Sequence, residues 1–146
     1  GDNMLDLFDD VLDYDATAKR VDYYLSVMVT KLLRIANESP AALKSPSMDG
    51  MPKSPHYENV NDTKMQKYID AKTEINSVGM VIRRCSRMAQ TILTKLYINH
   101  LPNVIVCDTI GYSHSQFAHL KKEALNEFAD RFECVRGGRD LHVYDE

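Results

Sequence analysis

The chain of 146 residues is poor in glycine and proline, and it contains no long hydrophobic run and no closely spaced cysteine pair. Six glycines and five prolines are too few for a turn-dense β-sandwich or barrel, so the composition favours helices. Because no stretch reaches about 18 apolar residues, we expect no membrane-spanning helix. Because no basic and apolar leader is visible, we expect a cytoplasmic protein rather than a secreted one.

The cysteines and the missing catalytic motifs exclude further classes of protein. Cys85, Cys107 and Cys134 are odd in number, and none forms a CxxC pair, so we expect buried, reduced thiols and no metal site. The sequence shows no P-loop, no HExxH motif and no nucleophile elbow. We therefore expect a protein that is not an enzyme and needs no cofactor.

Charge is distributed unevenly along the chain. Residues 1–82 carry nine basic against thirteen acidic side chains, whereas residues 83–136 carry eight basic against five acidic ones. Three of the five histidines also lie in the second stretch: His100, His114 and His119. Any contact with a polyanion is therefore expected in the second half of the chain.

The first half of the chain predicts two long amphipathic helices. Apolar residues recur every three or four positions from Val21 to Ile35, which predicts a helix from an Asp15 cap to about Asn37. A second helix is expected from residue 61 or 62 to about Cys85. The segment 38–61 between them holds four of the five prolines and predicts a long loop rich in Ser-Pro steps. Residues 1–85 therefore predict an antiparallel helical hairpin.

The chain before the hairpin combines aspartates with large apolar residues. In residues 1–14, Asp6 and Asp9 alternate with Leu5, Leu7 and Phe8. We interpret this segment as a short arm that packs on the protein's own core, the alternative being an arm that docks on a basic, apolar groove of a partner.

Residues 86–133 predict a second lobe of three helices. Ser86 is expected to cap a helix that ends near residue 99, and Asn103 to cap a short helix that offers Val104, Ile105 and Ile110 to the core. Gly111 then stands where a helix terminates in left-handed backbone. Ser113 is expected to cap the last helix. The core of this helix is predicted at Phe117, Leu120, Ala124, Leu125 and Phe128.

This order of short helix, glycine turn, serine cap and longer helix is typical of a helix-turn-helix, with a plain helical bundle as the alternative. The polar residues of the first turns would then face the base edges, and the two following lysines would reach phosphates. The predicted DNA-binding residues are Ser113, His114, Ser115, Gln116, His119, Lys121 and Lys122. A metal pair of His114 and His119 is disfavoured, because a spacing of five residues places them on different sides of a helix.

The same stretch resembles a known family. The residues that carry the resemblance are Ile92-Leu93 with Tyr97, Ile110-Gly111-Tyr112-Ser113-His114-Ser115, Lys121 to Leu125, and Phe128-Ala129. Residues 90–132 resemble region four of bacterial sigma factors and the ArpU-type phage late-gene regulators. The Ser-Pro loop around residues 45–53 and the helix after it are similar to ArpU-type and related RinA-type regulators. The resemblance covers residues from about 15 to 132.

The resemblance implies a small cytoplasmic phage or prophage protein that binds double-stranded promoter DNA and activates a late operon for packaging, structural proteins or lysis. Sigma factors place arginines and glutamate in the recognition helix, where this chain has His114, Ser115, Ala118 and His119. The preference of sigma factors for a −35 element is therefore not carried over.

The hairpin and the tail leave alternatives open. The hairpin is expected to contact either host RNA polymerase or a second copy of the chain, and we expect no membrane partner. A small terminase-like subunit that recognises DNA and oligomerises through its long helices is the alternative function. Residues 134–146 predict a flexible tail, in which Arg136 and Arg139 are candidates for a basic arm toward DNA.

Overall fold

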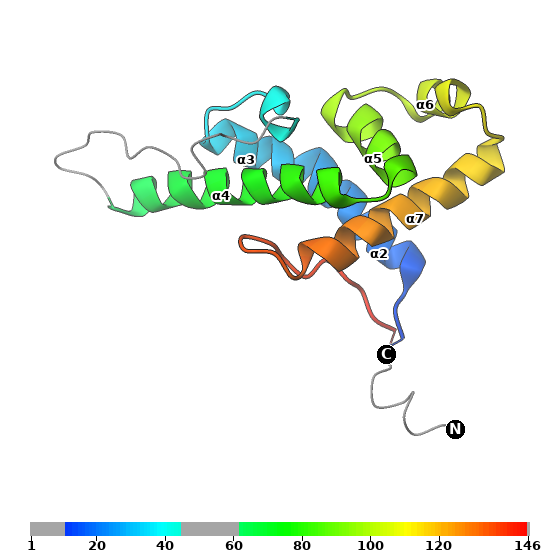
Figure 1. Cartoon of the computed structure of the whole chain (residues 1–146). Coiled ribbons are helices and arrows are strands. Elements are labelled where there is room, and N and C mark those ends of the chain that lie inside the picture. Colours follow the sequence, from blue (N-terminus) through cyan, green and yellow to red (C-terminus); the bar gives the residue numbers. More distant parts are fainter. Residues whose placement is uncertain (1–10, 45–61, 146) are drawn as a thin grey trace.

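The computed structural model describes residues 11–44 and 62–145, and these residues form an all-helical protein (Figure 1). Within them, β pairing is limited to an isolated antiparallel bridge between Leu12 and Tyr144. The prediction of an all-α protein is confirmed. The predicted N-terminal arm falls mostly, and the Ser-Pro loop largely, outside the described residues. None of the described helices is both long enough and apolar enough to cross a membrane.

The first long helix is continuous and has three parts. Helix α2 covers Tyr14–Tyr23, a π-helical segment η1 covers Tyr24–Met28, and α3 covers Val29–Ile35. Its cap lies two residues earlier than the predicted Asp15, because the carboxylate of Asp13 accepts a hydrogen bond from the Ala16 N–H at 2.9 Å. Ile35 lies on the solvent side with 47% of its surface exposed, so the predicted apolar face ends before it.

The second long helix, α4, covers Asp62–Arg84, in agreement with the predicted bounds. It packs against α3 and against a short 3-10 helix, η2, at Pro40–Leu43. Gly79 makes this approach possible, because a Cβ atom there would lie 2.7 Å from the carbonyl oxygen of Leu43. Arg83 adds a hydrogen bond of 3.0 Å from Nη1 to the same carbonyl oxygen. The start of the Ser-Pro loop is thereby fixed to the C-terminal part of α4.

The second half of the chain contains three further helices. Helix α5 covers Arg87–Leu93 and continues into a π-helical segment, η3, at Thr94–Ile98. Helix α6 covers Asn103–Ile110, and α7 covers His114–Phe132. Ser86 caps α5 as predicted, since its hydroxyl accepts from the Ala89 N–H. Asn103 does not cap α6, because Pro102 occupies the cap position and Asn103 is the first helical residue.

One hydrophobic core connects both halves of the chain. Helix α7 runs diagonally across the molecule and packs on α2, α5 and α4 (Figure 1). The rings of Tyr24, Phe128 and Phe132 form an aromatic cluster in this core, with centroids 5.3 Å apart between Tyr24 and Phe132 and 4.9 Å apart between the two phenylalanines. A break between α4 and α5 falls at residues 85 and 86, and α7, which follows this break, packs against α2, which precedes it.

The residues after α7 return along the helical body. The sequence predicts a flexible tail over 134–146, but the structure lays residues 134–145 against α2, α4 and α7. Leu141 and His142 are buried, with 6% and 7% of their surface exposed. The Val143 N–H donates to the Thr17 hydroxyl at 2.9 Å, and the Asp13 N–H donates to the Val143 carbonyl at the same distance. Burial and backbone hydrogen bonding therefore hold this tail in place.

Candidate functional site

The turn between α6 and α7 is fixed by backbone geometry and by one buried thiol. Gly111 adopts φ +86°, a left-handed conformation that L side chains rarely accept, as the sequence predicts. Its N–H donates to the Cys107 carbonyl at 3.0 Å and closes α6. The Cys107 thiol, which is buried, donates to the Tyr112 carbonyl at 3.1 Å. The angle between the two helices is thus set by residues 107–112.

A capping box begins α7. The Ser113 hydroxyl accepts from the Gln116 N–H at 3.2 Å, and the Gln116 side-chain oxygen accepts from the Ser113 N–H at 3.3 Å. The prediction of Ser113 as the cap is confirmed. Gln116, which the sequence assigns to base contacts, has its carbonyl oxygen engaged by the cap. Contact between Gln116 and DNA therefore requires its amide nitrogen or a change of rotamer.

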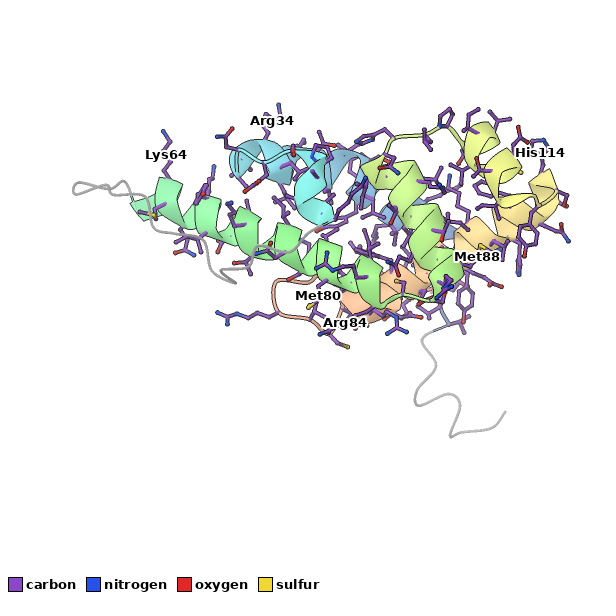
Figure 2. All side chains as sticks on the ribbon, turned by 45° about the horizontal axis from the view of Figure 1, so that its top comes forward. Arg34, Lys64, Met80, Arg84, Met88 and His114 are labelled. Carbon is purple, nitrogen blue, oxygen red and sulfur yellow. The ribbon has the colours of Figure 1, made fainter. Side chains whose placement is uncertain are left out.

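The first turns of α7 have one side that packs on the core and one side that faces solvent. Phe117 points into the core with 5% of its surface exposed, and Leu120 packs partly against it. His114, Ser115 and His119 are exposed. Figure 2 places His114 at the corner of α6 and α7, at the opposite end of the molecule from Lys64. The structure thus brings these polar residues together on one protruding helix end.

The two lysines and His119 are engaged by neighbouring polar groups. Lys121 Nζ donates to Asn103 Oδ1 at 3.1 Å, and Lys122 Nζ lies 3.2 Å from Asp15 Oδ1. His119 Nε2 lies 2.6 Å from Glu123 Oε1 within α7. Lys121 and Lys122 are half-buried, and the side chain of Lys122 is 40% exposed. Such exposed pairs contribute little free energy, so water or another anion can readily take the place of one partner.

Helix α6 is rotated relative to the sequence expectation. Val104 and Ile105 were expected in the core, but 50% and 45% of their surfaces are exposed. Val106 and Cys107 are buried in their place, with 0% and 2% exposed. The run from Val104 to Cys107 is apolar at every position, so it carries no helical period that could distinguish its two sides. The exposed apolar side chains thus include Val104 and Ile105 on α6 and the 41% exposed Tyr112 in the turn before α7.

The candidate basic arm is tied to the helices instead of extending from them. Arg139 donates from Nε and Nη2 to the two carboxylate oxygens of Glu74, each at 2.8 Å, and the Tyr24 hydroxyl donates to the same carboxylate. Burial and the neighbouring Glu74 raise the pKa of Tyr24 above its ordinary value, so the phenol keeps its proton. Ser77 donates to the Arg136 carbonyl. This network fixes the tail to α2 and α4.

A carboxylate joins the second half of α7 to the start of α5. Glu127 accepts from the Ser86 N–H at 2.6 Å, from the Ser86 hydroxyl at 2.9 Å and from Arg131 Nε at 3.1 Å. Partial burial opposes its ionisation, but these donors prevail and lower the pKa of Glu127.

The cysteines differ from the prediction in one respect, because Cys134 is exposed whereas Cys85 and Cys107 are buried. Burial raises the pKa of the Cys85 thiol to about 12.

Comparison with known proteins gives a similarity to a named regulatory protein. The chain is 27% identical over 108 residues to a protein of Enterococcus hirae named "Putative autolysin regulatory protein ArpU", and the match covers 73% of this chain and 79% of that protein. No family model matches the chain. No solved structure matches it either. The chain is therefore similar to ArpU over most of its length.

Proposed function

We propose that this protein is an ArpU-type, sequence-specific DNA-binding activator of phage or prophage late genes, acting on a packaging, structural or lysis operon. The observation that carries the proposal is the junction of α6 and α7. A glycine with φ +86° and a serine capping box join a short helix to a longer one whose first turns expose polar side chains. A helix-turn-helix has this layout, since its short turn often contains glycine and the N-terminal residues of its second helix contact base edges.

The similarity to ArpU supports the regulatory part of the proposal. That relative is named as a regulatory protein, and the match covers most of both chains. The sequence motifs around Gly111 and Lys121 resemble the ArpU-type regulators. A regulatory role and a DNA target are therefore proposed together. A cytoplasmic location, with neither a cofactor nor an enzymatic activity, is part of the same proposal.

Two kinds of contact are assigned to α7 within this proposal. His114, Ser115 and His119 are exposed in the first turns and would meet base edges in the major groove, with Gln116 joining them through its amide nitrogen. Lys121 and Lys122 would exchange Asn103 and Asp15 for phosphate oxygens. The partial positive charge at the start of α7 favours a phosphate near Ser113.

A second partner completes the proposal. A single helix-turn-helix contacts few base pairs, so useful affinity generally requires a dimer or another bound protein. We assign that role to the paired helices α3 and α4, which would contact a second copy of the chain or host RNA polymerase. The exposed apolar side chains of Val104, Ile105 and Tyr112 are available for the same purpose.

In vitro selection tests this function. The whole chain is incubated with a random duplex library at about 0.15 M salt, and bound duplexes are amplified and sequenced over several rounds. We expect one enriched motif, and a duplex carrying it should bind at least about 10³-fold more tightly than a scrambled duplex. Failure to enrich any motif would overturn the proposal. Native mass spectrometry of the complex distinguishes the activator from the alternative function. A ring of many chains would favour the terminase-like subunit, whereas a monomer or dimer on DNA would favour the activator.

A further inference from the structure

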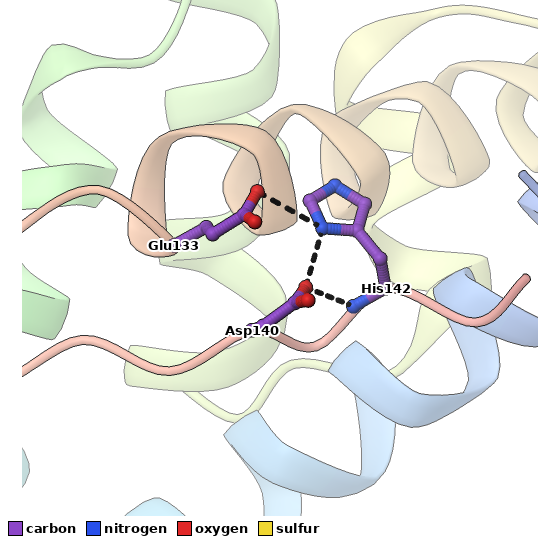
Figure 3. Close-up of side chains that lie close together, drawn as sticks. All are labelled: Glu133, Asp140 and His142. Atoms are coloured by element: carbon purple, nitrogen blue, oxygen red, sulfur yellow. Dashed lines mark hydrogen bonds and ion pairs between the residues drawn. The ribbon is translucent and has the colours of Figure 1, made fainter. Parts of the chain in front are cut away.

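Three side chains that the proposed DNA contacts do not use converge where the tail turns back along α7. They are Glu133, which caps the end of α7, and Asp140 and His142 of the tail (Figure 3). Each offers one atom that can ligate a metal ion, and these three atoms lie within 4.8 Å of one another. His142 Nδ1 lies 2.7 Å from Asp140 Oδ1 and 3.4 Å from Glu133 Oε2. Both carboxylates therefore approach the same ring nitrogen.

The imidazole of His142 is held rigidly in this position. Its side chain is 4% exposed, and its other nitrogen, Nε2, lies 2.7 Å from Asp130 Oδ1 on α7. The backbone adds two further restraints, because the His142 N–H donates to Asp140 Oδ1 at 3.0 Å and the His142 carbonyl accepts from Arg20 Nη1 at 3.1 Å. The carboxylate of Asp130 holds a proton on Nε2, so the Nδ1 lone pair can face a metal ion placed between Glu133 and Asp140, as it does in metal-binding histidines whose other nitrogen donates to a carboxylate.

The charges around the ring favour an added cation. Three carboxylates, those of Asp130, Glu133 and Asp140, approach one imidazole. Arg20 supplies one positive charge from α2, and a protonated ring would supply a second. Negative charge still exceeds positive charge in that state. A divalent cation that replaces the Nδ1 proton and lies between Nδ1 and the carboxylates of Glu133 and Asp140 would offset the excess, because an imidazole nitrogen binds a metal only without its proton.

We propose that Glu133, Asp140 and His142 bind a divalent transition-metal ion, Zn²⁺ in the first instance, through one oxygen of each carboxylate and through Nδ1, with water completing the coordination. One imidazole nitrogen with two carboxylate oxygens is a donor set that zinc accepts. The ion would lock the tail onto the end of α7. This inference stands apart from the proposed DNA contacts, which lie in the first turns of the same helix.

Calorimetric titration with Zn²⁺ alone, without DNA, tests the site. The whole chain is used with Cys134→Ser as the background, because the exposed thiol of Cys134 is itself a potential zinc ligand. We expect one Zn²⁺ per chain. His142→Gln should abolish this binding, and Glu133→Gln and Asp140→Asn should each weaken it at least tenfold. Asp130→Asn, which removes the carboxylate behind Nε2, should weaken it about 10- to 100-fold.

Glu123→Gln is the matched control. It removes the carboxylate of the other histidine–carboxylate pair on α7, in which Glu123 lies 2.6 Å from His119. Zinc binding should be the same in this variant as in the background protein. Thermal unfolding without metal checks that each variant is folded. Glu133 and Asp140 have side chains 42% and 47% exposed, so their variants decide the question even if His142→Gln does not fold.

Two results would overturn the proposal. One is a background protein that binds no Zn²⁺ at millimolar concentration. The other is binding that survives unchanged in Glu133→Gln and Asp140→Asn, which would place the ion elsewhere. In either case the cluster would be an ion-paired imidazole that fastens the tail without metal.

Discussion

The two halves of α7 belong to one helix but have opposite surroundings. In residues 114–122, Phe117 is the residue buried in the core, and its polar neighbours face solvent. Residues 123–132 are packed among α2, α4 and α5, and the tail lies beside them. Their buried positions are Ala124, Leu125, Asn126, Phe128, Ala129 and Phe132. One helix can therefore be anchored through its second half while its first half remains free for recognition.

Because the two halves differ in this way, substitutions in the second half should lower stability, whereas substitutions in the first half should weaken DNA binding. A free recognition surface on a small domain needs rigid support, since contacts that move by about 1 Å lose their geometry. The second half of α7 supplies that support through its aromatic cluster and through Glu127. The first half contributes its own cap and the buried ring of Phe117.

The largest effect is expected in the second half of α7. Phe128 has 0% of its surface exposed and lies against the rings of Tyr24 and Phe132. Phe128→Ala should lower the free energy of unfolding by about 3–5 kcal/mol, because it removes buried surface and leaves a cavity. His119→Ala, in the first half, should change it by less than about 0.5 kcal/mol. Urea denaturation measures both values, and equal losses would remove the distinction between the halves.

The tail should contribute the next largest effect. Arg139→Ala leaves the carboxylate of Glu74, whose side chain is 9% exposed, with one charged partner fewer. The free energy of unfolding should fall by about 1–3 kcal/mol, the cost of a buried polar group that loses a partner. Arg136→Ala is the control, because its exposed side chain lies three residues away. If the two variants have the same stability, the tail is not fastened through Glu74.

In the first half of α7, the expected loss is in DNA binding rather than in stability. His119→Ala and Gln116→Ala should each weaken binding to the selected duplex by about 1–3 kcal/mol, or roughly 5- to 150-fold in Kd, and relax the preference at particular base pairs. Gln116 also belongs to the capping box, so its variant requires a parallel stability measurement. Fluorescence anisotropy gives the affinities, and unaltered values for both variants would exclude these side chains as base contacts.

The lysines should produce a smaller effect that does not depend on sequence. Lys121→Ala and Lys122→Ala should weaken binding to selected and scrambled duplexes alike. Each lost phosphate contact should also reduce the slope of log K against log salt by about one. Binding titrations at several salt concentrations measure the slope. A lysine variant that loses affinity for the selected duplex alone would contact bases instead.

The smallest effect is expected in the response of stability to acid. Because the pKa of Glu127 is lowered in the folded protein, its ionised form stabilises the fold above the ordinary pKa of 4.5, and this contribution is lost as the pH falls through the lowered value. Glu127→Gln should therefore lose less stability than the parent between about pH 5 and pH 3. Thermal melting across this range tests the difference, and parallel curves would show that Glu127 does not contribute.

Local chemistry made much of the fold predictable. Ser86, Gly111 and Ser113 each act on backbone groups a few residues away, so their roles as caps and turn are visible in the sequence. The bounds of α4 follow from its apolar period and from the prolines before it. The exposed positions His114, Ser115 and His119 follow from the inward position of Phe117, because residues on opposite sides of a helix are fixed by its period.

Other features depend on contacts between distant residues and left no local pattern. The ion pair of Glu74 and Arg139 joins residues 65 positions apart, and the hydrogen bonds of Thr17 with Val143 join residues 126 positions apart. Neither pair has a periodic signal, so the tail was expected to be flexible. The rotation of α6 was missed for another reason, because its apolar run offers two equally hydrophobic sides and packing against α7 and η3 selects between them.

The most direct test of the distinction between the two halves is an NMR titration of the ¹⁵N-labelled whole chain with the selected duplex and with a scrambled one. If α7 is the recognition helix, the amides of residues 113–122 should shift most with the selected duplex and shift less with the scrambled one. The amides of residues 123–132 should change little. Large changes centred on Arg83, Arg84 and Arg87 or on the tail, with residues 113–122 unaffected, would contradict the assignment of α7 as the recognition helix.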